Sequence, residues 1–179
     1  MPVIRSARAA VLVSVLAVLA ALVAGAGAAA GTACLLPPVQ APVVDAFRSP
    51  GCPWCAGNRG LEFAVAPGTA VRAAAGGTVT FSGAVAGTVY VVVDHGDGLR
   101  ATYGRLASAA VAGGDRVATG AVVGRSGGGG LYFGLRRGDQ YVDPAPLLGR
   151  LVERWRLVPM DGSVARRPPP PEVRCPGRP

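Results

Sequence analysis

The sequence predicts an all-β domain, a sandwich or flattened barrel of about 100 residues. Short runs rich in Val, Thr, Tyr and Phe recur from Val43 onward, and clusters of Gly, Asp and Pro separate them at close spacing. No long helical period occurs before residue 147. The predicted strands are Val43–Phe47, Leu61–Ala64, Ala70–Ala73, Thr78–Ser82, Thr88–His95, Leu99–Tyr103, Val122–Arg125 and Leu131–Arg136.

A hairpin turn is predicted at His95-Gly96-Asp97-Gly98, between two of these runs. Asp-Gly is favoured in such turns because both residues adopt positive φ at low cost. His95 is the only histidine of the chain. We expect it to be a structural residue at the edge of the core.

Residues 1–30 have the pattern of a secretory signal peptide. Arg5 and Arg8 precede a long apolar run, which ends in the small residues Ala28-Ala29-Ala30, a possible cleavage site. The run is also long enough to span a bilayer, so an uncleaved membrane anchor is the alternative. In both cases the rest of the chain is exported, because the arginines remain on the inner side of the membrane.

Export permits disulfides, and the chain has four cysteines, which allow three pairings. Cys52 and Cys55 have the C-x-x-C spacing of redox pairs, but their surroundings are rich in Gly and Pro and lack the strand-to-helix setting of a thioredoxin. We therefore expect a structural disulfide in this loop, with Cys34 paired to Cys175 across the domain. A zinc site is not expected from four cysteines so unevenly spaced.

The flanks of the β region differ from it in composition. Residues 31–42 are predicted to be a Pro-rich linker, because three prolines in eight residues oppose both helix and sheet. Residues 149–179 are predicted to be the end of a short helix, within Leu147–Leu157, and a basic Pro-rich tail. The tail, with Arg166-Arg167 and Pro168–Pro171, is either a solvated terminus or a polyproline docking ligand.

The net charge of +8 comes from arginine, because the chain contains no lysine. Such a charge suits nucleic acid or an anionic polymer of the cell envelope. No basic run is interleaved with aromatic residues, so nucleic acid is not expected as a partner.

Several short stretches follow one another in a distinctive order. They are Asn58-Arg59-Gly60-Leu61-Glu62, Ala66-Pro67-Gly68-Thr69, Gly77-Thr78-Val79-Thr80-Phe81, Val91-Val92-Val93-Asp94-His95-Gly96, Thr102-Tyr103-Gly104-Arg105-Leu106, Leu131-Tyr132-Phe133-Gly134 and Val142-Asp143-Pro144. In this order and spacing, residues 43–148 resemble the lysostaphin/LytM-type peptidoglycan metallopeptidases, which share the duplicated hybrid motif fold. The resemblance implies one LytM-like domain, secreted and associated with the cell wall.

Enzymes of that family need a zinc ion with three protein ligands and an open position for water. The resemblance places the three ligand positions on Asn58, Glu62 and Tyr132, and the two other catalytic histidine positions on Arg105 and Gly130. Only Glu62 is a plausible oxygen ligand, and Arg105 brings a positive charge to the metal position. We therefore expect no cofactor, and zinc only if the chain is an active endopeptidase with atypical ligands.

The leading interpretation is a catalytically degenerate module that binds a peptidoglycan peptide or regulates a cell-wall hydrolase. We expect Arg105 to pair with Glu62 across the former metal site, beside a groove lined by Tyr132 and Tyr103; the alternative is that both charged side chains are solvated. Two other functions remain open, namely an active zinc endopeptidase that cleaves peptidoglycan cross-bridges and a purely structural envelope protein.

Overall fold

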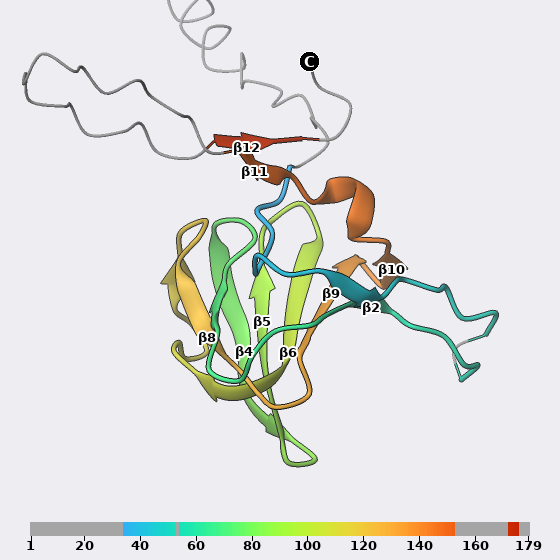
Figure 1. Cartoon of the computed structure of the whole chain (residues 1–179), viewed down its shortest axis with the longest axis horizontal. Helices are drawn as coiled ribbons and strands as arrows, with labels where there is room; N and C mark the ends of the chain where they lie inside the picture. Colours follow the sequence, from blue (N-terminus) through green and yellow to red (C-terminus); the bar gives the residue numbers. More distant parts are fainter. Residues whose placement is uncertain (1–33, 53, 153–171, 176–179) are drawn as a thin grey trace, which may run out of the picture. The chain divides into compact units, whose positions relative to one another are not determined.

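The computed structural model describes residues 34–52, 54–152 and 172–175, and the regular secondary structure of these residues consists of β-strands and one 3-10 turn (Figure 1). Ten strands form one sheet and two more form a separate ladder. The strands of the sheet are β1 (Val43–Asp45), β2 (Gly60–Phe63), β3 (Ala70–Arg72), β4 (Gly77–Val85), β5 (Thr88–Asp94), β6 (Leu99–Ala109), β7 (Arg116–Val117), β8 (Val122–Ser126), β9 (Leu131–Arg137) and β10 (Gln140–Val142). The ladder pairs β11 (Arg150–Val152) with β12 (Glu172–Arg174).

The main path of the sheet runs in the order β1-β2-β9-β6-β5-β4-β7, with β10 beside β9 and β8 joining β3 to β6. Strand β6 is its centre, because it pairs with β5, β9 and β8. It lies beside β9 from Leu99 to Gly104 and beside β8 from Leu106 onward. The change of partner occurs at Arg105, whose φ of 60° is left-handed. The sheet therefore curves at this residue.

Alternate residues of the central strands face the core, as the period of two along a strand requires. On β6, Leu99, Ala101 and Tyr103 are buried while the residues between them are partly exposed. On β9, Leu131 and Phe133 are buried in the same way. The centroid of the Phe133 ring lies 5.4 Å from the centroid of the Tyr103 ring. The other sheet residues of the core are Leu61, Phe63, Val71, Val79, Val91, Val93, Leu106, Val117, Val123 and Leu135.

The all-β prediction is confirmed, and each of the eight predicted runs contains a strand. The predicted hairpin turn is also present, between β5 and β6, and Gly96, Asp97 and Gly98 have φ of 84°, 49° and 72°. Strands β4 and β6 extend further than predicted, to Val85 and Ala109. The β4–β5 hairpin therefore extends well beyond the neighbouring strands (Figure 1).

The predicted helix at Leu147–Leu157 is wrong where the structure describes it. Ala145–Leu147 form a single 3-10 turn, and residues 150–152 are strand β11. Gly149, which follows this turn, is buried, and an added Cβ there would lie 2.8 Å from Cys34 Sγ. The chain extends instead of coiling because β11 finds a partner in β12, which the sequence pattern did not reveal. Residues 153–157 lie outside the described residues.

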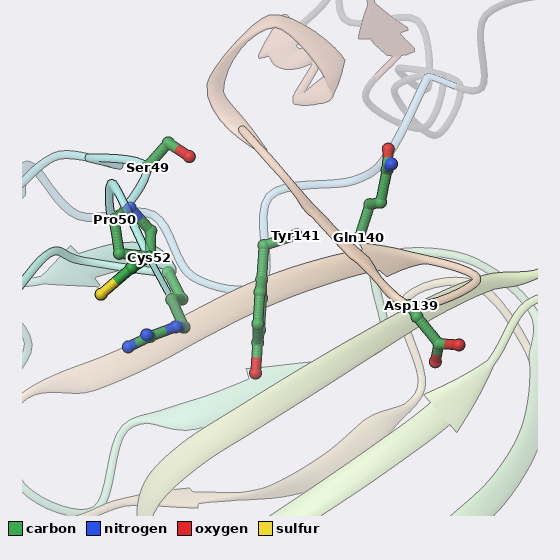
Figure 2. A pocket seen from close by; sticks show the side chains of 7 residues that line it. Ser49, Pro50, Cys52, Asp139, Gln140 and Tyr141 are labelled. Carbon is green, nitrogen blue, oxygen red and sulfur yellow. The ribbon is translucent and has the colours of Figure 1, made fainter. Parts of the chain in front are cut away.

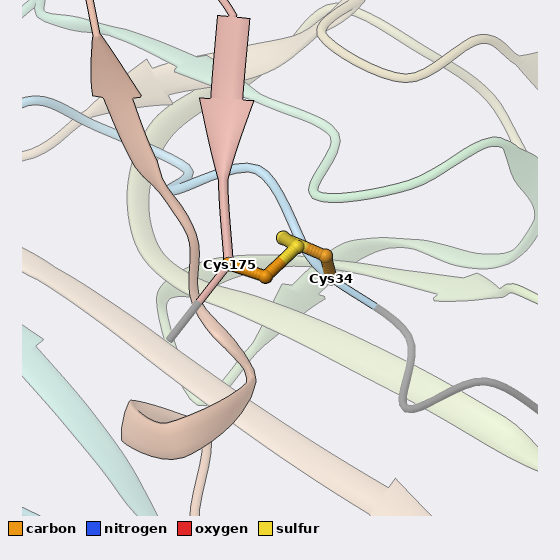
Figure 3. Close-up of a disulfide and its surroundings, with 2 residues drawn as sticks. All are labelled: Cys34 and Cys175. Atoms are coloured by element: carbon orange, nitrogen blue, oxygen red, sulfur yellow. A yellow bond between two sulfur atoms is a disulfide. The ribbon is translucent and has the colours of Figure 1, made fainter. Parts of the chain in front are cut away.

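The expected pairing of the cysteines is present, as Cys52–Cys55 and as Cys34–Cys175 (Figure 3). Next to Cys34, the Leu35 amide donates a hydrogen bond to the Leu147 carbonyl (2.8 Å), and the Gly149 amide donates one to the Leu35 carbonyl (2.8 Å). The start and the end of the domain are thus joined by both covalent and hydrogen bonds.

The Pro-rich segment expected as a linker packs on the sheet. Its chain is largely without regular structure, as the prolines predict, but Leu35 and Val39 belong to the hydrophobic core. The Leu36 amide donates a hydrogen bond to the Ala74 carbonyl (2.8 Å). These contacts make the segment part of the folded body.

Two predicted segments, the signal peptide at residues 1–30 and the tail at Arg166–Pro171, lie outside the described residues. Within the part of the chain that the structure describes, no helix has the length and apolarity needed to cross a membrane.

His95 is a structural residue at the start of the β5–β6 turn. Its Nδ1 lies 3.0 Å from the Gly76 carbonyl oxygen, and its Nε2 is buried without a hydrogen-bond partner in the described part of the chain. Burial lowers the pKa of His95 below its ordinary value of 6.5, and the Gly76 carbonyl and the Asp94 carboxylate oppose this shift only partly. The folded state therefore favours the neutral imidazole.

We predict that the domain loses stability as the pH falls through and below 6.5. Because the folded-state pKa of His95 is lower than the unfolded-state value, the unfolded chain takes up the proton first, and the stabilisation is fully present only above pH 6.5. Urea unfolding at pH 7.5 and pH 5 measures this effect. The His95→Asn variant should show a flatter pH dependence, and an unchanged slope would contradict the prediction.

Candidate functional site

The face of the sheet opposite the core brings together the residues singled out from the sequence. Glu62 on β2 is the cross-strand partner of Tyr132 on β9, and Tyr132 is in turn the partner of Gly104 on β6. Arg105 follows Gly104 at the bend of β6. Three neighbouring strands thus place a carboxylate, a phenol and a guanidinium next to one another on what we call the outward face.

Arg105 and Glu62 form a bidentate ion pair, as expected from the sequence. Arg105 Nη1 donates to Glu62 Oε2 at 2.8 Å and Nη2 donates to Oε1 at 2.5 Å, so both carboxylate oxygens are engaged. Nη1 also donates to the Gly129 carbonyl at 3.2 Å. The hydrogen bonds with Glu62 raise the pKa of Arg105 further above its ordinary value. With exposed fractions of 40% for Arg105 and 22% for Glu62, the pair is partly shielded from water.

The Tyr132 ring lies over a shelf of glycines. A Cβ added at Gly60 would lie 2.9 Å from Tyr132 Cε2, one at Gly104 would lie 3.2 Å from Cδ1, and one at Gly134 would lie 2.8 Å from the hydroxyl oxygen. The ring therefore occupies the space that side chains on three strands would fill. Burial raises the pKa of Tyr132 to about 12, so the phenol is neutral at physiological pH.

The other two family positions also lack the geometry of metal or proton-transfer groups. Asn58 is 7% exposed, and its amide oxygen accepts a hydrogen bond from the Gly60 amide at 3.2 Å. Gly130 has a φ of 79°, and a Cβ there would lie 2.6 Å from the Phe63 carbonyl oxygen. The backbone at residue 130 thus leaves no room for a side chain.

These residues do not fit a catalytic zinc centre. A neutral amide, a carboxylate engaged by a guanidinium and a protonated phenol stand where zinc enzymes supply imidazole, carboxylate or thiolate. The Arg105 charge also opposes a cation at Glu62. Across the described ranges, no group of three or more His, Cys, Asp or Glu could hold a metal ion.

The prediction that Tyr103 lines the groove is wrong. Tyr103 is fully buried, and its hydroxyl oxygen accepts a hydrogen bond from the Ala74 amide at 2.7 Å. It shares the inward parity of Leu99 and Ala101, which the alternation along β6 could have revealed. The aromatic residue that does lie beside Tyr132 is Tyr90 of β5, whose ring would be 2.6 Å from a Cβ at Gly104.

From Tyr90 the outward face continues as a shallow apolar hollow of about 380 Å³. Its lining comes from strands β4, β5 and β6, and consists of Phe81, Val85, Tyr90, Val92 and Thr102. Phe81 is 39% exposed and Val85 54% exposed.

Comparison with known proteins identifies a relationship over the same region. Residues 56–144 match peptidase family M23. The chain is 42% identical over 99 residues to the murein hydrolase activator EnvC of Escherichia coli (strain K12). This match covers 51% of this chain and 24% of EnvC. It is also 34% identical over 132 residues to an uncharacterised protein of Mycobacterium tuberculosis. That match covers 67% of this chain and 53% of the mycobacterial protein.

Among solved structures, the fold resembles the catalytic domain of the antimicrobial peptidase lysostaphin from Staphylococcus simulans, with a TM-score of 0.53 and 22% identity. The match covers 59% of this chain and 90% of the lysostaphin domain. At this identity the likeness shows the fold alone. The chain spans about a quarter of EnvC and about half of the mycobacterial protein.

We predict that Arg105 and Glu62 are energetically coupled. A double-mutant cycle with Arg105→Gln and Glu62→Gln should give a coupling energy of about 1 kcal/mol, because the pair is bidentate and partly shielded. Urea unfolding of the four proteins measures it. A coupling energy near zero would mean that the two side chains are solvated independently, and would contradict the ion pair.

Proposed function

Residues 56–144 are a domain of peptidase family M23, and we propose that the protein is an exported pseudoenzyme that binds peptidoglycan or regulates a cell-wall hydrolase without cutting. The observation that carries this proposal is the ion pair in which Arg105 engages both oxygens of Glu62. In this pair, the Arg105 guanidinium supplies the positive charge that a metal ion would supply at Glu62, the carboxylate position that the family uses as a ligand.

Hydrolysis by a zinc peptidase requires a metal-bound water of lowered pKa and groups that transfer protons. The guanidinium of Arg105 keeps its proton throughout the physiological range, so it cannot act as a general base. The phenol of Tyr132 is likewise neutral, and Gly130 has no side chain. Nothing among these residues activates a water molecule, which supports a binding role.

The outward face is well suited to bind an extended ligand. The ring of Tyr132 is held on its glycine shelf, the Arg105–Glu62 pair offers charges of both signs, and the apolar hollow begins at Tyr90. A surface ordered before binding loses little conformational entropy when a ligand arrives. The outward face therefore adds little to the entropic cost of ordering a peptide ligand.

The relatives support the cell wall as the place of action. EnvC is described as a murein hydrolase activator, and its matched segment is 42% identical to this chain. Because that segment is 24% of EnvC, the activating role is a proposal for this chain and not an inherited property. The two disulfides suit an oxidising compartment outside the cytoplasm, as does the predicted signal peptide. Membrane contact is expected only if that segment remains uncleaved.

The rival function is an active zinc endopeptidase with atypical ligands, which the family match favours. We predict that the oxidised exported domain, incubated with Zn²⁺ and desalted, retains far less than one equivalent of zinc, because each missing ligand removes several kcal/mol from a total of about 10–16 kcal/mol. Elemental analysis measures the zinc content. Near-stoichiometric zinc, with release of peptides from purified sacculi, would contradict the prediction and favour the active zinc endopeptidase.

We predict that the domain binds purified sacculi through the outward face. Arg105→Gln and Tyr132→Ala should each weaken co-sedimentation with sacculi about 5–10-fold, as expected for central residues of an interface. Arg116→Gln is the matched control, because this exposed arginine lies on β7, at the opposite end of the strand order from β2. Circular dichroism checks that each variant is folded.

The controls separate the remaining functions. Equal sedimentation of the Arg105, Tyr132 and Arg116 variants would mean that binding is nonspecific charge attraction to an anionic polymer. Absence of binding by the unaltered domain would favour either a structural role or a partner protein over the wall polymer itself.

A further inference from the structure

The second half of strand β4 forms an unpaired edge of the sheet, within the part of the chain that the structure describes. Along one edge β4 pairs with β5, but along the other it pairs with β7 only at its first two residues. The Val79 backbone is also engaged on that edge, through hydrogen bonds of 2.8 Å with Gly114 and Asp115. A bulge follows Val79, and beyond it no backbone hydrogen bond joins this edge to another described segment. We call Phe81–Val85 the free β4 edge.

The register of the β4–β5 hairpin shows which backbone groups point toward this edge. The two strands are joined by the two-residue turn Ala86-Gly87, whose φ of 50° and 81° match a type I′ turn. The pair that closes such a turn is hydrogen-bonded, and hydrogen-bonded pairs alternate with other pairs along the ladder. Gly83 therefore bonds to β5, while Ser82 and Ala84 direct their N–H and C=O groups to the free β4 edge.

This edge lacks the features that keep a sheet edge from pairing. The other marginal strands of the described sheet are short, with three residues in β1, β3 and β10 and two in β7. Beside β10, the loop with Pro50 and Cys52 lies across a hollow of about 750 Å³ from Tyr141 and the charged side chain of Asp139 (Figure 2). The free β4 edge contains neither a charged residue nor a proline. An edge without charge, proline or cover is a template for another strand.

The free β4 edge is complementary to itself. On its outward face, Phe81 and Val85 lie on either side of Gly83. In an antiparallel pair of two copies centred on Gly83, Phe81 of each copy lies opposite Val85 of the other. Ser82 of each copy then exchanges both backbone hydrogen bonds with Ala84 of the other. An aromatic residue opposite a β-branched one stabilises an antiparallel pair, so the two-fold arrangement satisfies backbone and side chains together.

The electrostatics of the hairpin also favour a second copy. The chain carries a net charge of +8, so two copies repel one another in general. Residues 73–93, which include all of β4 and all but the last residue of β5, contain no charged side chain. The hairpin also extends beyond the neighbouring strands (Figure 1). Two copies can therefore meet here without bringing charged side chains together.

We propose that the free β4 edge is an interface between two copies of this chain, which pair about Gly83 and join their sheets into one. The apolar hollows of the two copies then lie side by side, because Phe81 and Val85 line both the hollow and the junction. The interface is short, so the association is weak, with a Kd of about 0.1 mM. The inference does not depend on the proposed function, since the Arg105–Glu62 pair lies on other strands.

Sedimentation equilibrium of the oxidised chain from residue 31 measures the association. Dimers should prevail at about 1 mM protein, and added salt should strengthen them, because screening reduces the repulsion between positively charged copies. Amide NMR shifts that change with protein concentration should be largest at Ser82 and Ala84. A chain that stays monomeric up to about 1 mM, or a dimer whose amide shifts lie elsewhere, would overturn the proposal.

Gly83 allows a charge to be placed on the two-fold axis. A Cβ added there would lie 3.5 Å from Phe81 Cζ, which is an ordinary contact, so the monomer accommodates a side chain. Gly83→Lys and Gly83→Glu should each weaken the dimer at least about fivefold, because like charges then lie directly opposite each other. An equal mixture of the two variants should restore the association, because opposite charges then meet. Failure of the mixture to associate would overturn the pairing about Gly83.

Gly51→Lys is the matched control, because it adds the same charge far along the strand order from β4. Gly51 lies between Pro50 and Cys52 in the loop between β1 and β2 (Figure 2), and an added Cβ there meets nothing within 4 Å. It should leave the association unchanged, and an equal loss would assign the effect to net charge and overturn the proposal.

Ala84→Pro tests the backbone bonds without adding a charge. It removes an N–H that points to the free β4 edge and leaves the bonds to β5 in place, a position at which strands tolerate proline. It should weaken the dimer as Gly83→Lys does, and undiminished association would overturn the proposal. Circular dichroism checks the fold of each variant, and the amide shifts of the unaltered chain test the pairing without any substitution.

Discussion

The structure depends on one strand that must serve three partners. Strand β6 pairs with β5 along one edge, and along the other it pairs first with β9 and then with β8. A regular strand cannot do this, so the backbone turns at Arg105, where φ is positive. The same bend presents the Arg105 side chain to Glu62, two strands away. Curvature of the sheet and the charge pair on its outward face are therefore consequences of one backbone feature.

The outward face is built as much by absent side chains as by present ones. Glycine in a strand interior costs stability, because it loses more conformational entropy on folding and offers nothing to pack. Gly60, Gly104 and Gly134 nevertheless lie around Tyr132 on three neighbouring strands and leave the space that its ring occupies. The cost is offset by an aromatic surface held flat against the sheet, which suits binding better than bond cleavage.

Much of the fold was predictable because alternation, β-branched residues and Gly/Asp turns all indicate the same strands between Val43 and Arg136. The Arg105–Glu62 pair was also predictable, since opposite charges occupy positions that converge on one metal ion in the family. Tyr103 was placed on the wrong face because its motif was considered without counting parity along β6. Strand β11 was missed because its partner β12 is distant in sequence.

The bond between Cys34 and Cys175 joins residues 141 positions apart and encloses all the strands of the domain in one covalent ring. Pulling on the chain before Cys34 and after Cys175 would therefore load this bond directly, and the hydrogen bonds of the sheet would carry almost none of the force. With the disulfide reduced, the same pull would act first on the Leu35–Leu148 bridge and the short β11–β12 ladder. The oxidised domain is thus mechanically protected against tension applied through its two flanks.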